Sequence, residues 1–302
     1  MVNIYFTVNN IILNHFSILY QISLKGIVIE KNTITSIAIG GFDGMHRAHQ
    51  QLFKKLDKNG GILVIQNTYA NLSPFMHRKK HTLYPLYFYP LINIKHLSGE
   101  KFIKLIKEEF PNLEKIVVGY DFHFGHLAAN DNKDLKKLFK GKVEIINEYK
   151  VDGIAVHSRV IREYLRDGNI EVANKLLGYN YNMTGFVIKG QGLGKKQFVP
   201  TINIDVKDFL IPQEGIYITK TILNNKSHES VSFIGHRVTT DGKFAVETHI
   251  LDKEFNEIVP KNIEIEFMKK IRDNQKYEKF EDLKKQIEDD IKNASSWFLE
   301  KK

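Results

Sequence analysis

The sequence predicts an α/β protein in two parts, a doubly wound parallel sheet followed by an antiparallel β-barrel with a terminal helix. In the first half, from Ile37 to about Leu177, short β-branched runs alternate with helical patterns. Such alternation is typical of a parallel sheet that is covered by helices on both faces. Beyond Tyr181, apolar runs follow one another with few helices between them, which favours a small closed barrel.

The composition fits two folded domains. A length of 302 residues with 42% hydrophobic residues is enough for two cores. The chain has no cysteine, which rules out disulfides and thiolate metal sites and fits a reducing cytoplasm, where we expect the protein. The net charge of +9 favours anionic ligands such as nucleotides, and the excess is spread along the chain rather than gathered in a tail.

Residues 1–34 form an extension to which the sequence assigns no function. Residues 11–24 are fairly apolar, but polar side chains interrupt them, and the run is too short to span a membrane. No lysine or arginine precedes this run and no small-residue cleavage site follows it, so we expect neither a secretory signal nor a membrane partner.

In the first half, the strands and helices are predicted from their periodicity. The strands are 37–40, 61–65, 116–119 and 143–146, and the helices are 45–56, 99–109 and 131–139. Tyr84, Tyr87, Phe88 and Tyr89 are interpreted as a packed aromatic loop rather than a platform for an aromatic ligand. Ligands of such sheets bind beyond the carboxyl ends of the strands, so the segment after Gly40 is the expected site.

The segment 37–52, IAIGGFDGMHRAHQQL, contains the pattern on which the function prediction rests. Its glycines let the backbone approach a ligand, and the helix that follows points its unpaired N–H groups at the same place. His46 and His49 fall on one helical face, where two imidazoles can grip a polyphosphate and neutralise charge on a leaving group. Two surface histidines on an ordinary helix would give the same spacing.

In these residues the chain resembles the nucleotidylyltransferase superfamily, whose signature is His-x-Gly-His after the first strand. The longer string 40–50 is similar to the FAD synthetase branch, with Ala48 where that family has glycine. The resemblance implies ATP-binding residues in this turn and a catalytic role for the two histidines: Gly40, Phe42, Asp43, Gly44, His46 and His49.

Two later segments extend the resemblance. Segment 118–125 resembles the Val-Gly-x-Asp-Phe-Arg-Phe-Gly string of FAD synthetases, with His123 in place of arginine, which implies that Asp121 binds ATP and that Phe122 and Phe124 line a flavin or adenine site. An aromatic-rich loop after a strand would explain the same residues without a ligand. The Pro-His-Pro cluster usual in the family is absent from segment 66–75.

Segment 156–162 opens a helix that is predicted to end at residues 167–168, with Ser158 as a suitable N-cap. It also resembles the Ile-Ser-Ser-Thr-x-x-Arg motif that contacts ATP phosphates in nucleotidylyltransferases. Ser158 and Arg162 match this motif, while His157 and Arg159 replace its first serine and its threonine. The resemblance implies that Ser158 and Arg162 bind the phosphates of ATP.

In the second half, the glycines of segment 185–195 and the Pro-Thr-Ile-Asn of segment 200–203 resemble the riboflavin kinase module. Glycine backbone can wrap phosphates, and a threonine hydroxyl and an asparagine carbonyl are hard oxygen ligands suited to Mg²⁺. The resemblance implies an ATP site made of Gly190, Gly194, Lys195, Thr201 and Asn203, with Mg²⁺ held by Thr201 and Asn203.

Glu247 is the predicted base of this module. On a strand over 244–251, Glu247 and His249 share one face and point away from the apolar side. In the resembling family the matching glutamate takes the proton from the ribityl hydroxyl, although an exposed strand glutamate would look the same. Arg272 falls at a position where the family has a similar residue, so the resemblance implies that it lies near the flavin or the nucleotide. A helix with Phe280, Leu283, Ile287, Ile291 and Ala294 on its apolar face closes the chain.

The order of the two modules resembles that of the bifunctional riboflavin kinase/FAD synthetases. Residues 1–180 are then expected to transfer AMP from ATP to FMN, and residues 181–302 to phosphorylate riboflavin. The implied partners are riboflavin, FMN, ATP and FAD, with Mg²⁺ and no permanently bound cofactor, in a monomer or weak homo-oligomer.

Two other functions are compatible with parts of the sequence. One keeps the riboflavin kinase but makes the first domain a weak or regulatory nucleotide-binding module, because Ala48, Arg159 and the missing Pro-His-Pro cluster all lie there. A nucleic-acid-binding protein would need a clustered cationic face or a reader motif, and the sequence contains no such motif. We therefore expect no nucleic-acid partner.

Overall fold

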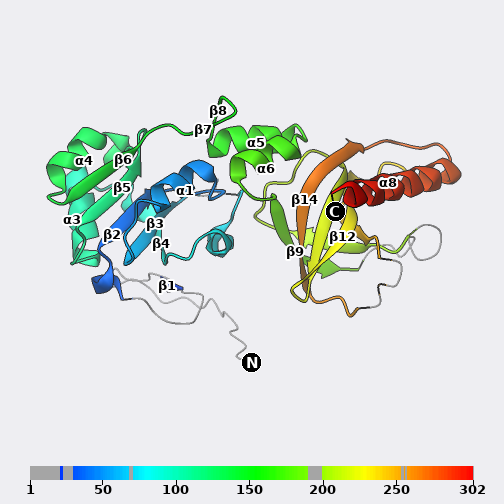
Figure 1. The fold of residues 1–302 in the computed structure, drawn as a ribbon, viewed down its shortest axis with the longest axis horizontal. Coiled ribbons are helices and arrows are strands. Elements are labelled where there is room, and N and C mark those ends of the chain that lie inside the picture. Colours follow the sequence, from blue (N-terminus) through cyan, green and yellow to red (C-terminus); the bar gives the residue numbers. More distant parts are fainter. Residues whose placement is uncertain are drawn as a thin grey trace.

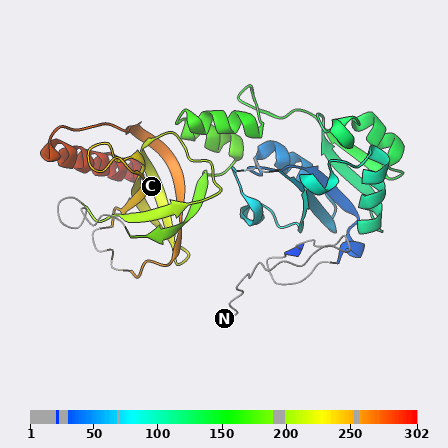
Figure 2. The same cartoon turned by 180° about the vertical axis from the view of Figure 1, so that it is seen from behind.

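The computed structural model describes residues 21–22, 30–67, 71–189, 199–252, 255 and 257–301. An open sheet flanked by helices forms one lobe and a closed barrel forms the other (Figure 1). Helices α5 (Ser158–Arg166) and α6 (Ile170–Leu177) lie between the two lobes, as the view from behind also shows (Figure 2). The predicted fold class is confirmed.

The sheet of the first lobe has six strands in the order β1-β4-β3-β2-β5-β6. They are β1 (Gln21–Ile22), β2 (Ser36–Gly40), β3 (Gly60–Gln66), β4 (Leu86–Pro90), β5 (Lys115–Gly119) and β6 (Lys142–Ile146). Strands β2 to β6 are parallel, and β1 pairs with β4 in the antiparallel sense, so part of the unassigned extension completes this edge. From β2 the chain continues to the neighbouring β3 and then to β4, and it returns to β5 on the other side of β2. The strand order therefore reverses between β2 and β5.

Helices bury both faces of this sheet. Ile37 and Ile39 of β2 belong to the core that includes α3 (Gly99–Glu109) and α4 (Asn132–Leu138), whereas Ala38 belongs to the core on the side of α1 (Arg47–Phe53). Successive side chains of a strand point to opposite faces, so a strand that is covered on both sides must be apolar throughout. The remaining short elements of the lobe are η1 (Lys31–Thr33), η2 (Phe75–His81), α2 (Leu91–Ile94), η3 (His126–Ala128), β7 (Lys150–Val151) and β8 (Ile154–Ala155).

The predicted aromatic loop around Tyr87 is wrong. Residues Leu86 to Tyr89 form most of β4 and are buried, with Tyr87 fully enclosed. Their side chains alternate between the two covered faces, so Tyr87 packs on one core and Phe88 on the other. A run of four buried residues shows no polar alternation, which is why its strand character was not recognised from periodicity.

The second lobe is a closed antiparallel barrel of six strands in the order β10-β13-β12-β11-β14-β9. They are β9 (Asn182–Ile188), β10 (Ile202–Val206), β11 (Gly215–Leu223), β12 (Lys226–His236), β13 (Phe244–Ile250) and β14 (Asn262–Asp273). Strand β10 was not predicted. Buried hydroxyls join three neighbouring strands through hydrogen bonds of 2.8–2.9 Å among Thr219, Thr221, Ser230, Ser232 and Thr248.

Helix α8 (Phe280–Glu300) packs on the outside of the barrel. Ala294 and Phe298 contact the core formed by Ile216, Ile218 and Val231. The predicted apolar face is confirmed at Ala294, but Phe280 at the start of the helix is 52% exposed. The helix therefore contacts the barrel chiefly through its second half.

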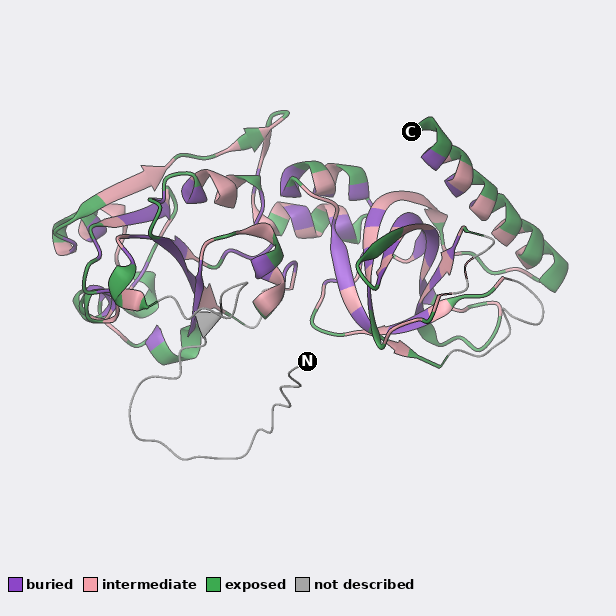
Figure 3. Cartoon of the chain, turned by 60° about the horizontal axis from the view of Figure 1, so that its bottom comes forward, coloured by how far each residue is buried: buried purple, intermediate pink, exposed green. Residues whose placement is uncertain are grey.

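The core of the barrel continues into α5 and α6. Leu165 and Leu177 of these helices pack in the same cluster as Tyr181, Ile204 and Phe267. Figure 3 shows buried stretches, in purple, on the helices between the two lobes and on the barrel strands. The 3-10 helix η2 of the first lobe also reaches the second, since His77 packs edge-on against Phe209 and His81 stacks on Tyr179. The predicted division at residue 180 thus falls inside a shared core, and the boundary stays a prediction. Among the described residues, no helix has the length and apolar character needed to cross a bilayer.

Because of these interface histidines, stability should depend on pH. Burial lowers the pKa of His77 to about 3 and that of His81 to about 4, from 6.5. Between these values and 6.5 the unfolded chain binds more protons than the folded one, so the free energy of unfolding decreases as the pH falls through this range. We expect a lower Tm at pH 5 than at pH 7, and a smaller difference in the double variant His77→Gln/His81→Gln, measured by thermal denaturation.

The exposed His96 provides the matched control, because His96→Gln should leave the pH dependence as in the wild type. A double variant that loses as much Tm as the wild type between pH 7 and pH 5 would contradict the assignment.

Candidate active site

A pocket of about 570 Å³ lies at the carboxyl ends of β2 and β5, where the strand order reverses. This is where doubly wound sheets bind their ligands, and the volume is within the roughly 300–1,000 Å³ of small-molecule sites. Five segments of the chain line the pocket: the turn after β2 with the start of α1, the end of β3, the loop after β5, the segment after β6 and the start of α5. The predicted site residues among the lining are Gly40, Phe42, Asp43, His46, His49, Asp121, Phe122, Ser158 and Arg162.

His46 and His49 stack face to face in this pocket, with ring centroids 3.5 Å apart. His46 is the N-cap of α1, and its Nδ1 accepts a hydrogen bond from the backbone N–H of His49 at 3.4 Å. A neutral His46 therefore carries its proton on Nε2. Burial lowers the pKa of His46 to about 3 and that of His49 well below 6.5. At neutral pH the pair therefore provides uncharged hydrogen-bond donors.

Phe42 and Gly44 shape the turn that presents these histidines. The Phe42 ring is buried and packs edge-on against His49, with centroids 5.1 Å apart. Gly40 makes room for this ring, because a Cβ there would lie 3.1 Å from it. Gly44 has φ +81° and its Cβ would lie 3.0 Å from Leu72, so both conformation and space require glycine.

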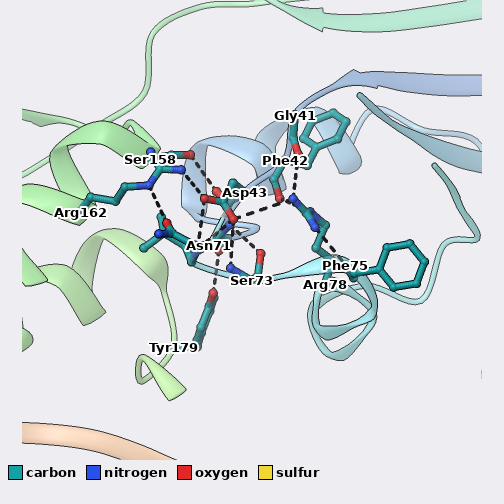
Figure 4. A network of polar contacts seen from close by, with 12 residues as sticks. Gly41, Phe42, Asp43, Asn71, Ser73, Phe75, Arg78, Ser158, Arg162 and Tyr179 are labelled. Atoms are coloured by element: carbon teal, nitrogen blue, oxygen red, sulfur yellow. Dashed lines mark hydrogen bonds and ion pairs between the residues drawn. The ribbon is translucent and has the colours of Figure 1, made fainter. Parts of the chain in front are cut away.

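The Asp43 carboxylate is buried and bonded to protein groups (Figure 4). It accepts hydrogen bonds from the backbone N–H groups of Leu72 at 3.1 Å and Ser73 at 3.0 Å, and from the guanidinium of Arg162. A second guanidinium nitrogen, from Arg78, lies 3.9 Å away. We therefore interpret Asp43 as a positioning residue that holds the turn, the loop after β3 and α5 together.

Several residues around Asp43 were missed in the sequence. Arg78 is fully buried and its Nε donates to the carbonyl of Phe42 at 3.1 Å. Ser73 accepts from the N–H of Gly44 at 2.7 Å, and Tyr179 donates to the carbonyl of Gly44 at 2.7 Å. Arg78 belongs to the basic run of residues 77–81, which resembles a solvated surface, so no sequence signal marked it as buried.

Helix α5 begins at Ser158, and His157 is its N-cap, so the predicted capping role of Ser158 is wrong. The Ser158 hydroxyl instead donates to the carbonyl of Asp43 at 2.8 Å. One turn later, Arg162 donates to the side-chain oxygen of Asn71 at 3.1 Å as well as to Asp43. Its guanidinium is thereby fixed at the wall of the pocket.

The loop after β5 divides its aromatic residues between the pocket and the core. Phe122 lines the pocket and stacks on Phe124, with ring centroids 5.7 Å apart. Phe124 itself is buried and packs with Phe102 of α3. Of these two predicted flavin contacts, the pocket includes Phe122 only.

A second cluster of predicted residues lies on the outer face of the barrel. Strand pairing places Asn203 of β10 directly opposite Glu247 of β13, and the Thr201 hydroxyl donates to one Glu247 oxygen at 3.3 Å. The other Glu247 oxygen accepts from Arg237 at 3.2 Å, and Arg237 also binds both oxygens of Asp241 at 3.0 Å. Arg237 was missed in the sequence, because nothing in its spacing links it to Glu247.

Four further residues were predicted for the kinase site. Gly190, Gly194 and Lys195 lie outside the described residues. The guanidinium of Arg272 forms hydrogen bonds with the buried Asp290 of α8 at 2.9 and 2.7 Å, which joins β14 to this helix. The predicted flavin contact of Arg272 stays a prediction.

Removal of the Asp43 carboxylate should destabilise the first lobe. Asp43→Ala leaves Arg162 and two backbone N–H groups without their shared acceptor, so we expect a loss of about 3 kcal/mol in the free energy of unfolding, measured in urea. The exposed Asp57, which pairs with Lys115, is the control, and Asp57→Ala should lose less than about 1 kcal/mol. Equal losses in the two variants would contradict a special role for Asp43.

Comparison with known proteins adds to this geometry. The family model described as riboflavin kinase matches residues 177–298, which cover the barrel and most of α8. A protein of Listeria monocytogenes is 28% identical over 87% of this chain and 92% of its own length, and one of Mycoplasma pneumoniae is 29% identical over 88% and 98%. Both are named bifunctional riboflavin kinase/FMN adenylyltransferase.

A solved structure from Streptococcus pneumoniae, titled a macrolide-efflux protein, superposes with a TM-score of 0.76. It is 24% identical and covers 88% of this chain and 98% of its own. At this identity the likeness concerns the fold, and it shows that both lobes recur together in another protein. With a riboflavin kinase module in the barrel and relatives that match across both lobes, the chain belongs to the family of bifunctional riboflavin kinase/FMN adenylyltransferases.

Proposed function

We propose that this chain makes FMN and then FAD, with the two reactions in separate lobes. Residues 181–302 phosphorylate riboflavin with ATP, and residues 1–180 transfer AMP from a second ATP to FMN. The observation that carries the proposal is the presence of two separate clusters suited to phosphates. One gathers His46, His49 and Arg162 at the switch point of the sheet, and the other gathers Thr201, Asn203 and Glu247 on the barrel.

In the barrel, Glu247 acts as the general base. It takes the proton from the ribityl hydroxyl as that oxygen attacks the γ-phosphorus, the bond from this phosphorus to its bridging oxygen breaks, and ADP leaves. Arg237 holds one oxygen of the Glu247 carboxylate, and Thr201 holds the other. These contacts fix the base on a rigid strand before the substrate arrives, which favours a reactive geometry.

The same cluster fits a Mg²⁺ ion. Thr201 and Asn203 offer hard oxygens on the face that carries Glu247, and the described residues contain no group of three or more His, Cys, Asp or Glu that could form a metal cage. Mg²⁺ typically takes one or two protein oxygens and completes its shell with phosphates and water. When bound with ATP it would neutralise phosphate charge.

In the first lobe, a phosphate oxygen of FMN attacks the α-phosphorus of ATP, the bond from this phosphorus to the α–β bridging oxygen breaks, and pyrophosphate leaves. The N–H donors of His46 and His49 stabilise the negative charge that develops on the leaving group. Arg162 adds a fixed cation, oriented by Asp43 and Asn71. The step needs no covalent enzyme intermediate.

Incubation of the purified protein with riboflavin, ATP and Mg²⁺ tests the proposal. Chromatography should show FMN first and FAD later, with neither product when Mg²⁺ is left out. Accumulation of FMN without FAD would instead favour a riboflavin kinase with a regulatory first domain.

His46→Ala should lower FAD formation from FMN at least a hundredfold, because the variant lacks a donor at the departing pyrophosphate. FMN formation from riboflavin should stay as in the wild type, which also shows that the variant is folded. The exposed His96→Ala is the control, and equal FAD rates in both variants would contradict the role of His46.

Glu247→Gln should have the opposite effect. The amide keeps the size of the side chain but cannot accept the proton, so the rate of FMN formation should fall at least a hundredfold, as followed by chromatography. FAD formation from added FMN should not change. A variant that still phosphorylates riboflavin at the wild-type rate would exclude Glu247 as the base.

A further inference from the structure

His157 brings a third imidazole to the nucleotide pocket of the first lobe. It is the N-cap of α5 and lines the pocket with Ser158 and Arg162. The Ser158 hydroxyl donates to the Asp43 carbonyl, and the side chain of Arg159 is 86% exposed beside Glu163. At the start of α5, His157 is therefore the side chain best placed to meet a ligand.

Tyr120 and Glu148 surround this imidazole on the pocket wall. The Nε2 of His157 lies 3.4 Å from the Tyr120 hydroxyl and 3.9 Å from a Glu148 oxygen, and the same hydroxyl donates to Glu148 at 3.3 Å. Glu148 also pairs with Lys150 at 3.0 Å. Hydrogen bonding from Lys150 is the largest cause that lowers the pKa of Glu148, so this carboxylate is ionised at neutral pH and favours a protonated neighbour.

The other charged or titratable groups of the pocket wall are His46, His49, Asp43, Asp121, His123, Tyr149 and Arg162. His157 is close enough to the first two to lower the pKa of both, although burial is the larger cause. His46 and His49 are neutral, and the charge of Arg162 is balanced by Asp43. A triphosphate that entered this pocket would thus meet little net positive charge.

We propose that His157 is a further binding residue for the phosphate chain of the nucleotide, held by Tyr120 and Glu148 as a protonated donor. The inference rests on the proposed adenylyl transfer in this pocket. The side chain of His157 is 36% exposed, so the imidazole can exchange protons with water. The phosphates and Glu148 both favour the imidazolium, so ATP should bind more tightly as the pH falls through the range in which an imidazole gains its proton.

Steady-state kinetics of FAD formation from FMN test this assignment. In His157→Gln, which keeps a donor but loses the charge, the KM for ATP should rise about tenfold at pH 6 and much less at pH 8.5. In the wild type we expect the KM for ATP to increase with pH, and in Glu148→Gln this increase should occur at a lower pH. The neighbouring Arg159→Ala is the control and should match the wild type at both pH values. FMN formation from riboflavin should not change in any of these variants.

Two kinetic outcomes would overturn the inference. One is an unchanged KM for ATP in His157→Gln at both pH values. The other is an increase by the same factor at pH 6 and pH 8.5, which would indicate a structural role without a charge.

NMR of the ¹⁵N-histidine-labelled protein separates this inference from the proposed reaction. The His157 signal is identified by its absence in His157→Gln, and addition of ATP at pH 7 should move it toward the protonated form. If the wild type forms no FAD, the proposed adenylyl transfer fails, while a protonation shift of His157 would still support the phosphate contact. If the His157 signal does not change when ATP is added, the inference that His157 contacts the phosphates is overturned.

Discussion

The buried carboxylate of Asp43 is the interaction on which the nucleotide pocket depends. It joins three segments that are distant in the sequence: the turn after β2, the loop that contains Leu72 and Ser73, and helix α5 through Arg162. A charge that is buried in this way is stable only when its partners hold it in good geometry, so the three segments are fixed together. The position of the histidines and of Arg162 at one wall follows from this arrangement.

Within the pocket, charge and hydrogen bonding are divided among different residues. His46 and His49 are buried and neutral, so they contribute directed N–H donors that need no protonation at neutral pH. Arg162 contributes a permanent charge, but Asp43 balances it in the unliganded protein. A site of this kind holds oxygens in place without a strong positive field. Additional attraction for a polyphosphate then depends on further groups of the pocket wall, such as the proposed phosphate contact His157.

The two lobes share more than a linker. Tyr179 donates to the carbonyl of Gly44 in the nucleotide turn, and Tyr181 donates to the carbonyl of Leu210 in the barrel at 2.6 Å. The N–H of Leu210 in turn binds the carbonyl of Asn71, whose side chain holds Arg162. Together with the core shared by α5, α6 and the barrel, these bonds support the nucleotide pocket from the kinase side. The barrel thus contributes to the stability of a site that none of its described residues lines.

The sequence by itself determined the fold class and the order of the two modules, and it predicted residues that the structure gathers into two clusters. These properties depend on local periodicity and on short motifs, such as the turn around His46 and the segment with Thr201 and Asn203. The tertiary structure alone decided which groups surround them. Arg78 is buried among groups distant in the sequence, Arg237 reaches Glu247 across a strand connection, and Ser158 bonds to Asp43 instead of capping its own helix. Burial also decided that the histidine pair is neutral, because the pKa of an imidazole depends on solvent exclusion, which the spacing of residues does not reveal.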